Sequence, residues 1–290
     1  MSLAFSKWTG LGNDFVLYEP GQTPEYGAAF TERVIKLCDR RFGVGADGVV
    51  IVTPMDKDGC LVLDGISDGP VAKAVANGVD FEMRIFNADG SEAAMCGNAT
   101  RCVAKYIVSR GLAKAGQNVF NLHTKSGLVK PALLDDGRVC VDMGEPRNFL
   151  GSIKLTADSF DFTAETVSMG NPHAVIFVDD IEKIQLEKWG SILEVDSQFP
   201  DRCNIEFAQV IPAAGAAPTQ IRMRVWERGC GVTMACGTGS CATLVAAQRT
   251  GRVGVEADVI LDGGVLHIKH EEGGPVLMTG PAEEVFKGTI

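Results

Sequence analysis

The segment IRMRVWERGCGVTMACGTGSCATL, Ile221–Leu244, contains a strand pattern, a glycine-rich turn and the start of a helix. Apolar and polar residues alternate in its first part, which predicts a β-strand. Cys236 follows in a run of small residues that leads directly into an apolar, helix-forming stretch. A cysteine in the exposed opening turn of a helix has no packing role to fill, so its position indicates chemistry.

A second copy of this segment occurs earlier in the chain as FEMRIFNADGSEAAMCGNATRCVA, Phe81–Ala104. Met83 and Cys96 align with Met223 and Cys236 at one ungapped offset of 140 positions. A shorter echo, LGNDF at residues 11–15 and MGNPH at residues 169–173, has an offset of 158. Only two copies occur, which excludes a solenoid and predicts two similar units that arose by duplication.

We therefore predict an α/β (α+β) fold of two pseudo-symmetric units, each a largely antiparallel sheet wrapped around a central helix that begins at its cysteine. The helices should end at Gly111 and Gly251, where a left-handed stop is expected. The predicted N-terminal half covers residues 1–124, with a C-terminal strand at 279–290 returning to it, and the C-terminal half covers residues 125–278. We interpret the glycine-rich stretch Asp58–Asp80 as a surface excursion of the first unit.

The composition narrows the functional class. The 290 residues carry a net charge of −10 without a basic cluster, which argues against nucleic-acid and membrane-surface partners. The first residues lack the basic and apolar zones of a signal peptide, and the nine cysteines are an odd number, so we expect a reducing cytoplasm. Cysteine and histidine spacings match no structural zinc pattern, and no lysine lies in a phosphate-binding context. We expect neither metal nor cofactor.

The two helix starts are suited to one reaction. A helix N-terminus presents unpaired N–H groups and a partial positive charge, which favour an anion and a thiolate. If both ends face one small carboxylate, two sulfurs flank the adjacent carbon, and one can remove a proton while the other returns one. Such a pair inverts a stereocentre without a cofactor. Ordinary helix capping is the alternative interpretation for either site alone.

Long motifs along the chain resemble diaminopimelate epimerase, a cofactor-independent enzyme of the lysine pathway. The matching motifs are FSKWTGLGNDFVLYE, RRFGVGADGVV, MRIFNADGSEAAMCGN, VSMGNPH, RCNIEF, VWERGCGVTMACGTGSCA and MTGPA. The resemblance implies interconversion of LL- and meso-diaminopimelate by two bases, in a cytoplasmic isomerase that forms a homodimer. None of the departures from the family pattern, such as Val232 for Glu or Ala99 for Gly, removes a catalytic group.

The resemblance also implies a role for each matching residue. Cys96 and Cys236 are the two bases. The reacting carboxylate lies on the backbone amides of Gly97, Asn98, Gly237 and Thr238, and Asn13 contacts the substrate. The distal amino-acid end is held by Asn87, Asn171, Asn204 and Arg228, while His173 and Glu227 contact the substrate's reacting centre and orient or polarise it. Taken singly, these residues could also be turn formers, surface charges or a satisfied buried histidine.

Two alternatives remain on sequence grounds. The first is a cofactor-free racemase of another amino acid, for example histidine, on the same fold. The second is a different class of protein, either a non-catalytic amino-acid-binding protein or a thiol–disulfide redox protein. The distal polar set speaks against the first, and the even division of the two cysteines between the halves speaks against redox chemistry.

Overall fold

The computed structural model describes residues 4–18, 28–55, 78–212 and 219–290. Its chain divides into two compact units: unit 1 contains Met1–Val141 and Pro281–Ile290, and unit 2 contains Asp142–Gly280. The boundary predicted between residues 124 and 125 stays a prediction about the duplicated halves. Apart from residues 78–80, the predicted surface excursion lies outside the described residues.

Unit 1 is built on one sheet with the strand order β19-β1-β2-β3-β4-β6-β7, and β5 pairs with β4. The pairs β2–β3 and β4–β6 are parallel, and the others are antiparallel. Its elements are β1 (Ala4–Gly10), β2 (Asn13–Tyr18), α1 (Ala28–Cys38), β3 (Gly48–Pro54), β4 (Phe81–Asn87), β5 (Glu92–Ala93), α2 (Gly97–Ser109), β6 (Leu122–Thr124), β7 (Gly127–Val129), the hairpin of β8 (Ala132–Leu133) and β9 (Val139–Asp142), and β19 (Glu283–Thr289). The C-terminal strand β19 thus pairs with the N-terminal strand β1.

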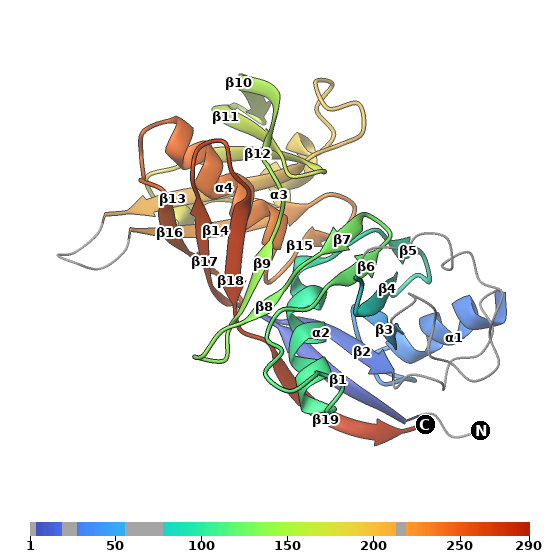
Figure 1. Ribbon diagram of the computed structural model, residues 1–290. Coiled ribbons are helices and arrows are strands. Elements are labelled where there is room, and N and C mark those ends of the chain that lie inside the picture. Colours follow the sequence, from blue (N-terminus) through green and yellow to red (C-terminus); the bar gives the residue numbers. More distant parts are fainter. Residues whose placement is uncertain (1–3, 19–27, 56–77, 213–218) are drawn as a thin grey trace. The chain divides into compact units, whose positions relative to one another are not determined.

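Unit 2 repeats this plan in the order β10-β11-β12-β13-β14-β16-β17-β18, and β15 pairs with β14. Here β12–β13 and β14–β16 are the parallel pairs. Its elements are β10 (Arg147–Ala157), β11 (Phe160–Ser168), β12 (Pro172–Phe177), η2 (Ile181–Lys183), α3 (Leu186–Leu193), β13 (Asn204–Ile211), β14 (Gln220–Glu227), β15 (Gly231–Val232), α4 (Gly237–Arg249), β16 (Glu256–Leu261), β17 (Gly264–His270) and β18 (Val276–Gly280) (Figure 1).

The two units correspond strand by strand. The parallel pairs occur at the same steps of the chain, so β2, β3, β4 and α2 of unit 1 match β12, β13, β14 and α4 of unit 2. In unit 1 Phe15 lies opposite Gly48, and in unit 2 His173 lies opposite Asn204. The predicted fold class is confirmed, including the largely antiparallel sheets. Neither α1 nor α3 was predicted from the sequence.

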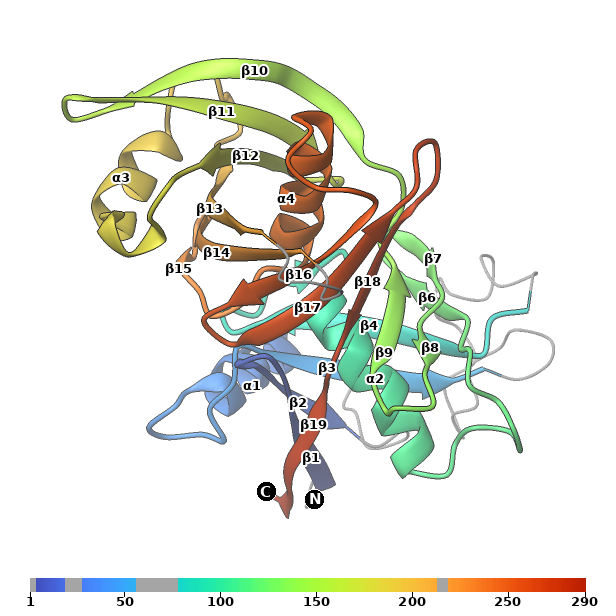
Figure 2. The ribbon, with the colours of Figure 1, turned by 90° about the vertical axis from the view of Figure 1, so that its left-hand side faces the viewer.

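Each central helix packs against its own sheet. Helix α4 contacts β11, β12 and β13 as well as β16, β17 and β18, so the curled sheet encloses it (Figure 2). Ten of its residues are buried, because small and apolar side chains occur all around the helix. Helix α2 packs on β1 and β2 in the same way. None of the described helices combines the length and apolar character needed to cross a membrane.

Both central helices begin and end where the sequence predicts. Cys96 is the N-cap residue of α2, and Cys236 is the N-cap residue of α4, each with an extended backbone. Gly111 and Gly251 follow the helices with φ angles of 68° and 67°, a left-handed conformation that glycine adopts without a Cβ clash. The fold therefore places a thiol at the N-terminus of each buried helix.

Candidate active site

The start of α2 contains the first predicted base. Cys96 is half-buried, and its Sγ lies 3.7 Å from Asn13 Oδ1. Asn98, in the first turn of α2, donates from Nδ2 to the same oxygen at 3.2 Å. Asn13 is the first residue of β2, which runs beside the helix start. The structure thus brings together Cys96, Asn13 and Asn98, as the resemblance implies.

A carboxylate fixes the orientation of the Asn13 amide. Asn13 Nδ2 donates to Asp47 Oδ2 at 2.7 Å, so the Asn13 carbonyl oxygen is turned toward α2. Arg40 in turn binds Asp47 at 2.7 Å and Asp14 at 2.8 Å. Burial opposes ionisation of Asp14, but the contacts with Arg40 and Lys7 hold its pKa below the ordinary value. Asp47 and Arg40 were not predicted as site residues, because their only signal was their place in the motif RRFGVGADGVV.

The start of α4 is more enclosed. Cys236 is 5% exposed, and its Sγ accepts a hydrogen bond from Gly239 N at 3.3 Å. Thr238 Oγ1 lies 3.6 Å from the same sulfur, and Glu227 also forms a hydrogen bond with Cys236. Burial and the charges of Glu227 and Glu206 raise the pKa of Cys236 well above its ordinary value, against the lowering effect of Thr238 and Gly239. The N–H donor of the helix start lowers the pKa of Cys236, as expected, but burial and two carboxylates raise it more, so the net direction is opposite to our expectation of a favoured thiolate.

Asn171 and His173 connect the start of β12 to this helix start. Asn171 Nδ2 donates to Thr238 Oγ1 at 3.3 Å, and Asn171 Oδ1 lies 3.1 Å from His173 Nε2. The opposite ring nitrogen, Nδ1, is 2.6 Å from Glu206 Oε1 on β13. His173 is fully buried in this network. No role was predicted for Glu206, although a glutamate within the apolar strand NIEFA was a signal of a buried charge.

Three more of the predicted site residues lie at the ends of the neighbouring strands β13 and β14, namely Asn204, Glu227 and Arg228. Asn204 donates from Nδ2 to Pro172 O at 2.8 Å and accepts from Arg228 N at 3.0 Å, so it holds two backbone segments together. The Arg228 side chain is exposed and donates to Asp201 O at 3.1 Å. Burial, together with the charge of Glu206, raises the pKa of Glu227, although Thr233, Cys236 and His173 lower it.

The predicted site residues thus form one group in each unit. In unit 2, hydrogen bonds link Asn171, His173, Glu227, Cys236 and Thr238, and Asn204 and Arg228 bind each other. In unit 1 the group is Asn13, Cys96 and Asn98. Asn87, at the exposed end of β4, instead donates to Ser91 Oγ at 3.0 Å. Gly97 and Gly237 are the first residues of α2 and α4 and are buried.

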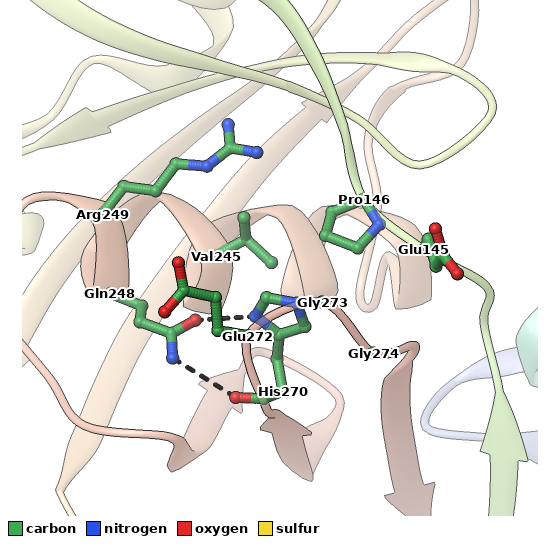
Figure 3. A pocket seen from close by; sticks show the side chains of 9 residues that line it. All are labelled: Glu145, Pro146, Val245, Gln248, Arg249, His270, Glu272, Gly273 and Gly274. Atoms are coloured by element: carbon green, nitrogen blue, oxygen red, sulfur yellow. Dashed lines mark hydrogen bonds between the residues drawn. The ribbon is translucent and has the colours of Figure 1, made fainter.

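A separate cavity of about 380 Å³ lies at the other end of α4 (Figure 3). Val245, Gln248 and Arg249 line it from the last turns of the helix, and His270 lines it from β17. Gln248 Oε1 lies 2.7 Å from His270 Nδ1, so these two side chains are committed to each other. None of the predicted site residues lines this cavity, which separates it from the candidate site.

Comparison with known proteins gives a consistent result. The family model for diaminopimelate epimerase matches residues 5–149 and 165–285. A diaminopimelate epimerase of Pelotomaculum thermopropionicum is 43% identical over 300 residues, covering 98% of this chain and 97% of the relative. Diaminopimelate epimerase 1 of a Nostoc species is 40% identical over 307 residues, covering all of both chains.

Solved structures share the fold at low sequence identity. A PhzF-family phenazine biosynthesis protein of Bacillus anthracis matches with a TM-score of 0.66 at 15% identity, covering 100% of this chain and 99% of that one. A hydroxyproline epimerase of Agrobacterium vitis matches with a TM-score of 0.66 at 15% identity, covering 100% and 92%. The repeated sheet-and-helix units, their two N-capping cysteines and the full-length relatives place this chain in the diaminopimelate epimerase family.

Proposed function

We propose that the protein is an isomerase that interconverts LL- and meso-diaminopimelate, a step of lysine and cell-wall precursor biosynthesis, by a cofactor-independent two-base mechanism. The observation that carries the proposal is the equivalent placement of Cys96 and Cys236 as N-caps of matching helices. Membership of the family supports the substrate, because the full-length relatives bear that name.

In the proposed reaction both cysteines act on the same substrate carbon. One cysteine thiolate removes the α-proton from one face, and the thiol of the other cysteine gives its proton to the opposite face. The C–H bond broken on one face is replaced by a C–H bond on the other, so configuration inverts and the protonation states of the sulfurs are exchanged. Because the pKa of Cys236 is raised, we propose that Cys236 is the thiol in the resting enzyme and Cys96 is the base that starts the conversion.

The difficult intermediate is the carbanion, whose charge delocalises into the neighbouring carboxylate. We propose that the backbone N–H groups of Gly97 and Asn98 in α2, and of Gly237 and Thr238 in α4, bind this carboxylate. The buried Gly97 and Gly237 allow close approach of a ligand to these amides. Fixed N–H donors of this kind contribute on the order of 3 kcal/mol each to transition-state stabilisation.

The distal amino-acid end of the substrate needs a second set of polar groups. We propose Asn87, Asn171, Asn204 and Arg228 for this set, with Asn13 contacting the substrate near Cys96 and with His173 and Glu227 contacting the reacting centre. The exposed guanidinium of Arg228 suits a bidentate grip on a carboxylate. The amides of Asn171 and Asn204 already bond to protein groups, so substrate binding at these residues exchanges existing hydrogen bonds.

Exchange of the α-hydrogen in deuterated water tests the mechanism. Each stereoisomer is supplied separately, and NMR and mass spectrometry follow deuterium and configuration. A two-base enzyme introduces solvent deuterium into the product isomer from the first turnover, because the returning proton comes from the second thiol. Inversion with retention of the substrate's own hydrogen in the product would contradict two separate bases.

A substrate panel tests the specificity. We expect turnover of diaminopimelate and little or none of histidine, proline or other amino acids with one amino-acid end. Racemisation of a simple amino acid with none of diaminopimelate would favour the racemase alternative. Tight binding of an amino acid without any exchange would favour a binding protein.

We also propose that the enzyme is a cytoplasmic homodimer. All eight cysteines of the described residues are free of disulfides, which suits a reducing compartment. Light scattering on the purified protein measures the molar mass, and a single species at the monomer mass of 30.8 kDa would contradict the dimer.

A further inference from the structure

Unit 2 contains a buried histidine–carboxylate pair behind Cys236. His173 and Glu206 are both fully buried, and their Nδ1 and Oε1 atoms are 2.6 Å apart. The other carboxylate oxygen, Glu206 Oε2, has no hydrogen-bond partner within the described part of the chain. A buried carboxylate with one orphaned oxygen costs stability. Its presence therefore calls for a role beyond packing.

Each hydrogen bond between this pair and Cys236 has an assignable donor and acceptor. Asn171 donates from Nδ2 to Thr238, which leaves its Oδ1 to accept from His173 Nε2. This arrangement makes Nε2 a donor to Asn171, with one further proton between Nδ1 and Glu206. Thr238 Oγ1 already accepts from Asn171, so its own proton is available to Cys236 Sγ, 3.6 Å away. This chain of hydrogen bonds begins at Glu206 and ends at Thr238, whose hydroxyl donates to the sulfur.

The first turn of α4 is shaped around this carboxylate. A Cβ atom at Gly239 would lie 2.7 Å from Glu206 Oε1, closer than side chains tolerate, and would also make a tight contact of 3.2 Å with Cys236 Sγ. Only glycine leaves room here for both the carboxylate and the sulfur. Glu206 thus lies directly against the turn that contains Cys236.

Unit 1 shows what the same scaffold contains without the pair. By the matching strand registers, Phe15 occupies the place of His173, and Val50 occupies that of Glu206. Ala99 stands where unit 2 has Gly239, and both Val50 and Ala99 are fully buried. The exchanges fit each other sterically: Val50 is smaller than Glu206, so it leaves space for the methyl group of Ala99. The pair is thus a property of the Cys236 side alone.

We infer that Glu206 is a positioning residue that acts through His173. It keeps a proton on Nε2 facing Asn171, and so fixes the direction of the hydrogen-bond chain that ends at the Cys236 sulfur. This inference rests on the proposed function for its catalytic consequence. When Cys236 gives its proton to the substrate carbon, the thiolate left behind is stabilised by two donors, Gly239 N–H and Thr238 O–H. His173 in this arrangement is a donor and not the base that removes the α-proton.

The test is Glu206→Gln, which keeps the size of the side chain and one hydrogen bond to Nδ1 but removes the charge. We expect kcat for diaminopimelate to fall by at least about tenfold, with KM within about twofold, because the lost interaction acts on the proton transfer. In protein labelled with ¹⁵N-histidine, we expect both ring nitrogens of His173 to carry protons in the wild type. The Nδ1 proton of the short hydrogen bond should be strongly downfield and disappear in E206Q.

A double-mutant cycle separates positioning from bulk structural damage. His173→Phe copies unit 1 and also assigns the resonance. If Glu206 acts through His173, adding E206Q to H173F lowers kcat by no more than about twofold further. Asp258→Asn is the matched control, because Asp258 binds His267 at 2.9 Å in the same unit but both side chains are partly exposed. We expect D258N to keep wild-type kcat.

Three outcomes would overturn the inference: a wild-type spectrum without a proton on Nε2, E206Q with wild-type kcat, or a double variant in which the two losses multiply. The wild-type spectrum needs no variant, so the first step can be judged even if E206Q fails to fold. A protein with the expected histidine spectrum but no epimerase activity would refute the proposed function and leave the assignment of Glu206 supported.

Discussion

The starts of α2 and α4 occupy the same place in two units of the same topology, yet their surroundings differ. Cys96 is half-buried beside an asparagine carbonyl. Cys236 is 5% exposed and is approached by Glu227, Thr238 and Gly239. Duplication has thus kept the backbone plan of the two helix starts while the side chains around them have diverged. The difference supports the proposal that Cys236 is the thiol of the resting enzyme.

The asparagines that accompany the two cysteines are also turned in opposite directions. Asn13 presents its carbonyl oxygen to α2, because Asp47 binds its amide nitrogen. Asn171 presents its amide nitrogen to α4, because His173 faces its carbonyl oxygen. In each unit a carboxylate orients the amide. Asp47 binds Asn13 directly in unit 1, and Glu206 acts on Asn171 through His173 in unit 2.

Replacing either cysteine tests whether both helix starts are required. Cys96→Ala and Cys236→Ala should each lower full inversion by on the order of 10³-fold or more, since each removes one proton-transfer group. The serine variants should keep only a trace, because a hydroxyl is far less acidic than a thiol. Epimerase assays with circular dichroism of the folded proteins measure this, and a normal rate for Cys236→Ala would falsify the two-base mechanism.

Oxidation tests whether the two sulfurs approach each other, as the proposed mechanism requires. A mild oxidant should join Cys96 and Cys236 and abolish activity, and a reductant should restore it. Mass spectrometry of the non-reduced peptides identifies the bond. Unchanged activity after complete oxidation of both thiols would contradict the prediction.

Arg228 is a further difference between the two units, because its counterpart in unit 1 is Ala88. Arg228→Ala should raise KM by about tenfold to a hundredfold, the loss of a charge-assisted hydrogen bond worth roughly 1.5–3 kcal/mol, with a smaller change in kcat. The surface variant Arg138→Ala, which removes an ion pair with Asp136, is the control and should leave KM unchanged. An effect confined to kcat would assign Arg228 to the chemistry and not to the distal grip.

The alkylation rates of the two thiols report the difference in their surroundings without any substitution. The raised pKa of Cys236 means a smaller thiolate fraction at pH 7, and burial limits access. Iodoacetamide should therefore modify Cys236 at least about tenfold more slowly than Cys96 at pH 7, and the Cys236 rate should keep rising above the ordinary thiol pKa of about 8.5. Peptide mass spectrometry gives both rates, with exposed Cys230 as the reference. Equal rates at pH 7 would remove the proposed asymmetry.

Much of the fold could be predicted from the sequence, because its signals are local. Alternation predicted β4 and β14, small residues after a cysteine predicted the two helix starts, and glycine predicted the left-handed stops at Gly111 and Gly251. The single offset of 140 positions indicated the duplication. Helices α1 and α3 were not predicted, because they lie between motifs and do not belong to the repeated segment.

The residues that recur in the two halves, and with them the positions of the two thiols and their helices along the chain, can be read from the sequence alone. The partners that surround each thiol depend on how the chain folds. Asp47 reaches Asn13, and Glu206 reaches His173, through contacts 34 and 33 positions apart in the chain. The first contact depends on the parallel pairing of β2 with β3, and the second on the pairing of β12 with β13 and on the burial of both side chains. Neither periodicity nor propensity encodes such contacts locally.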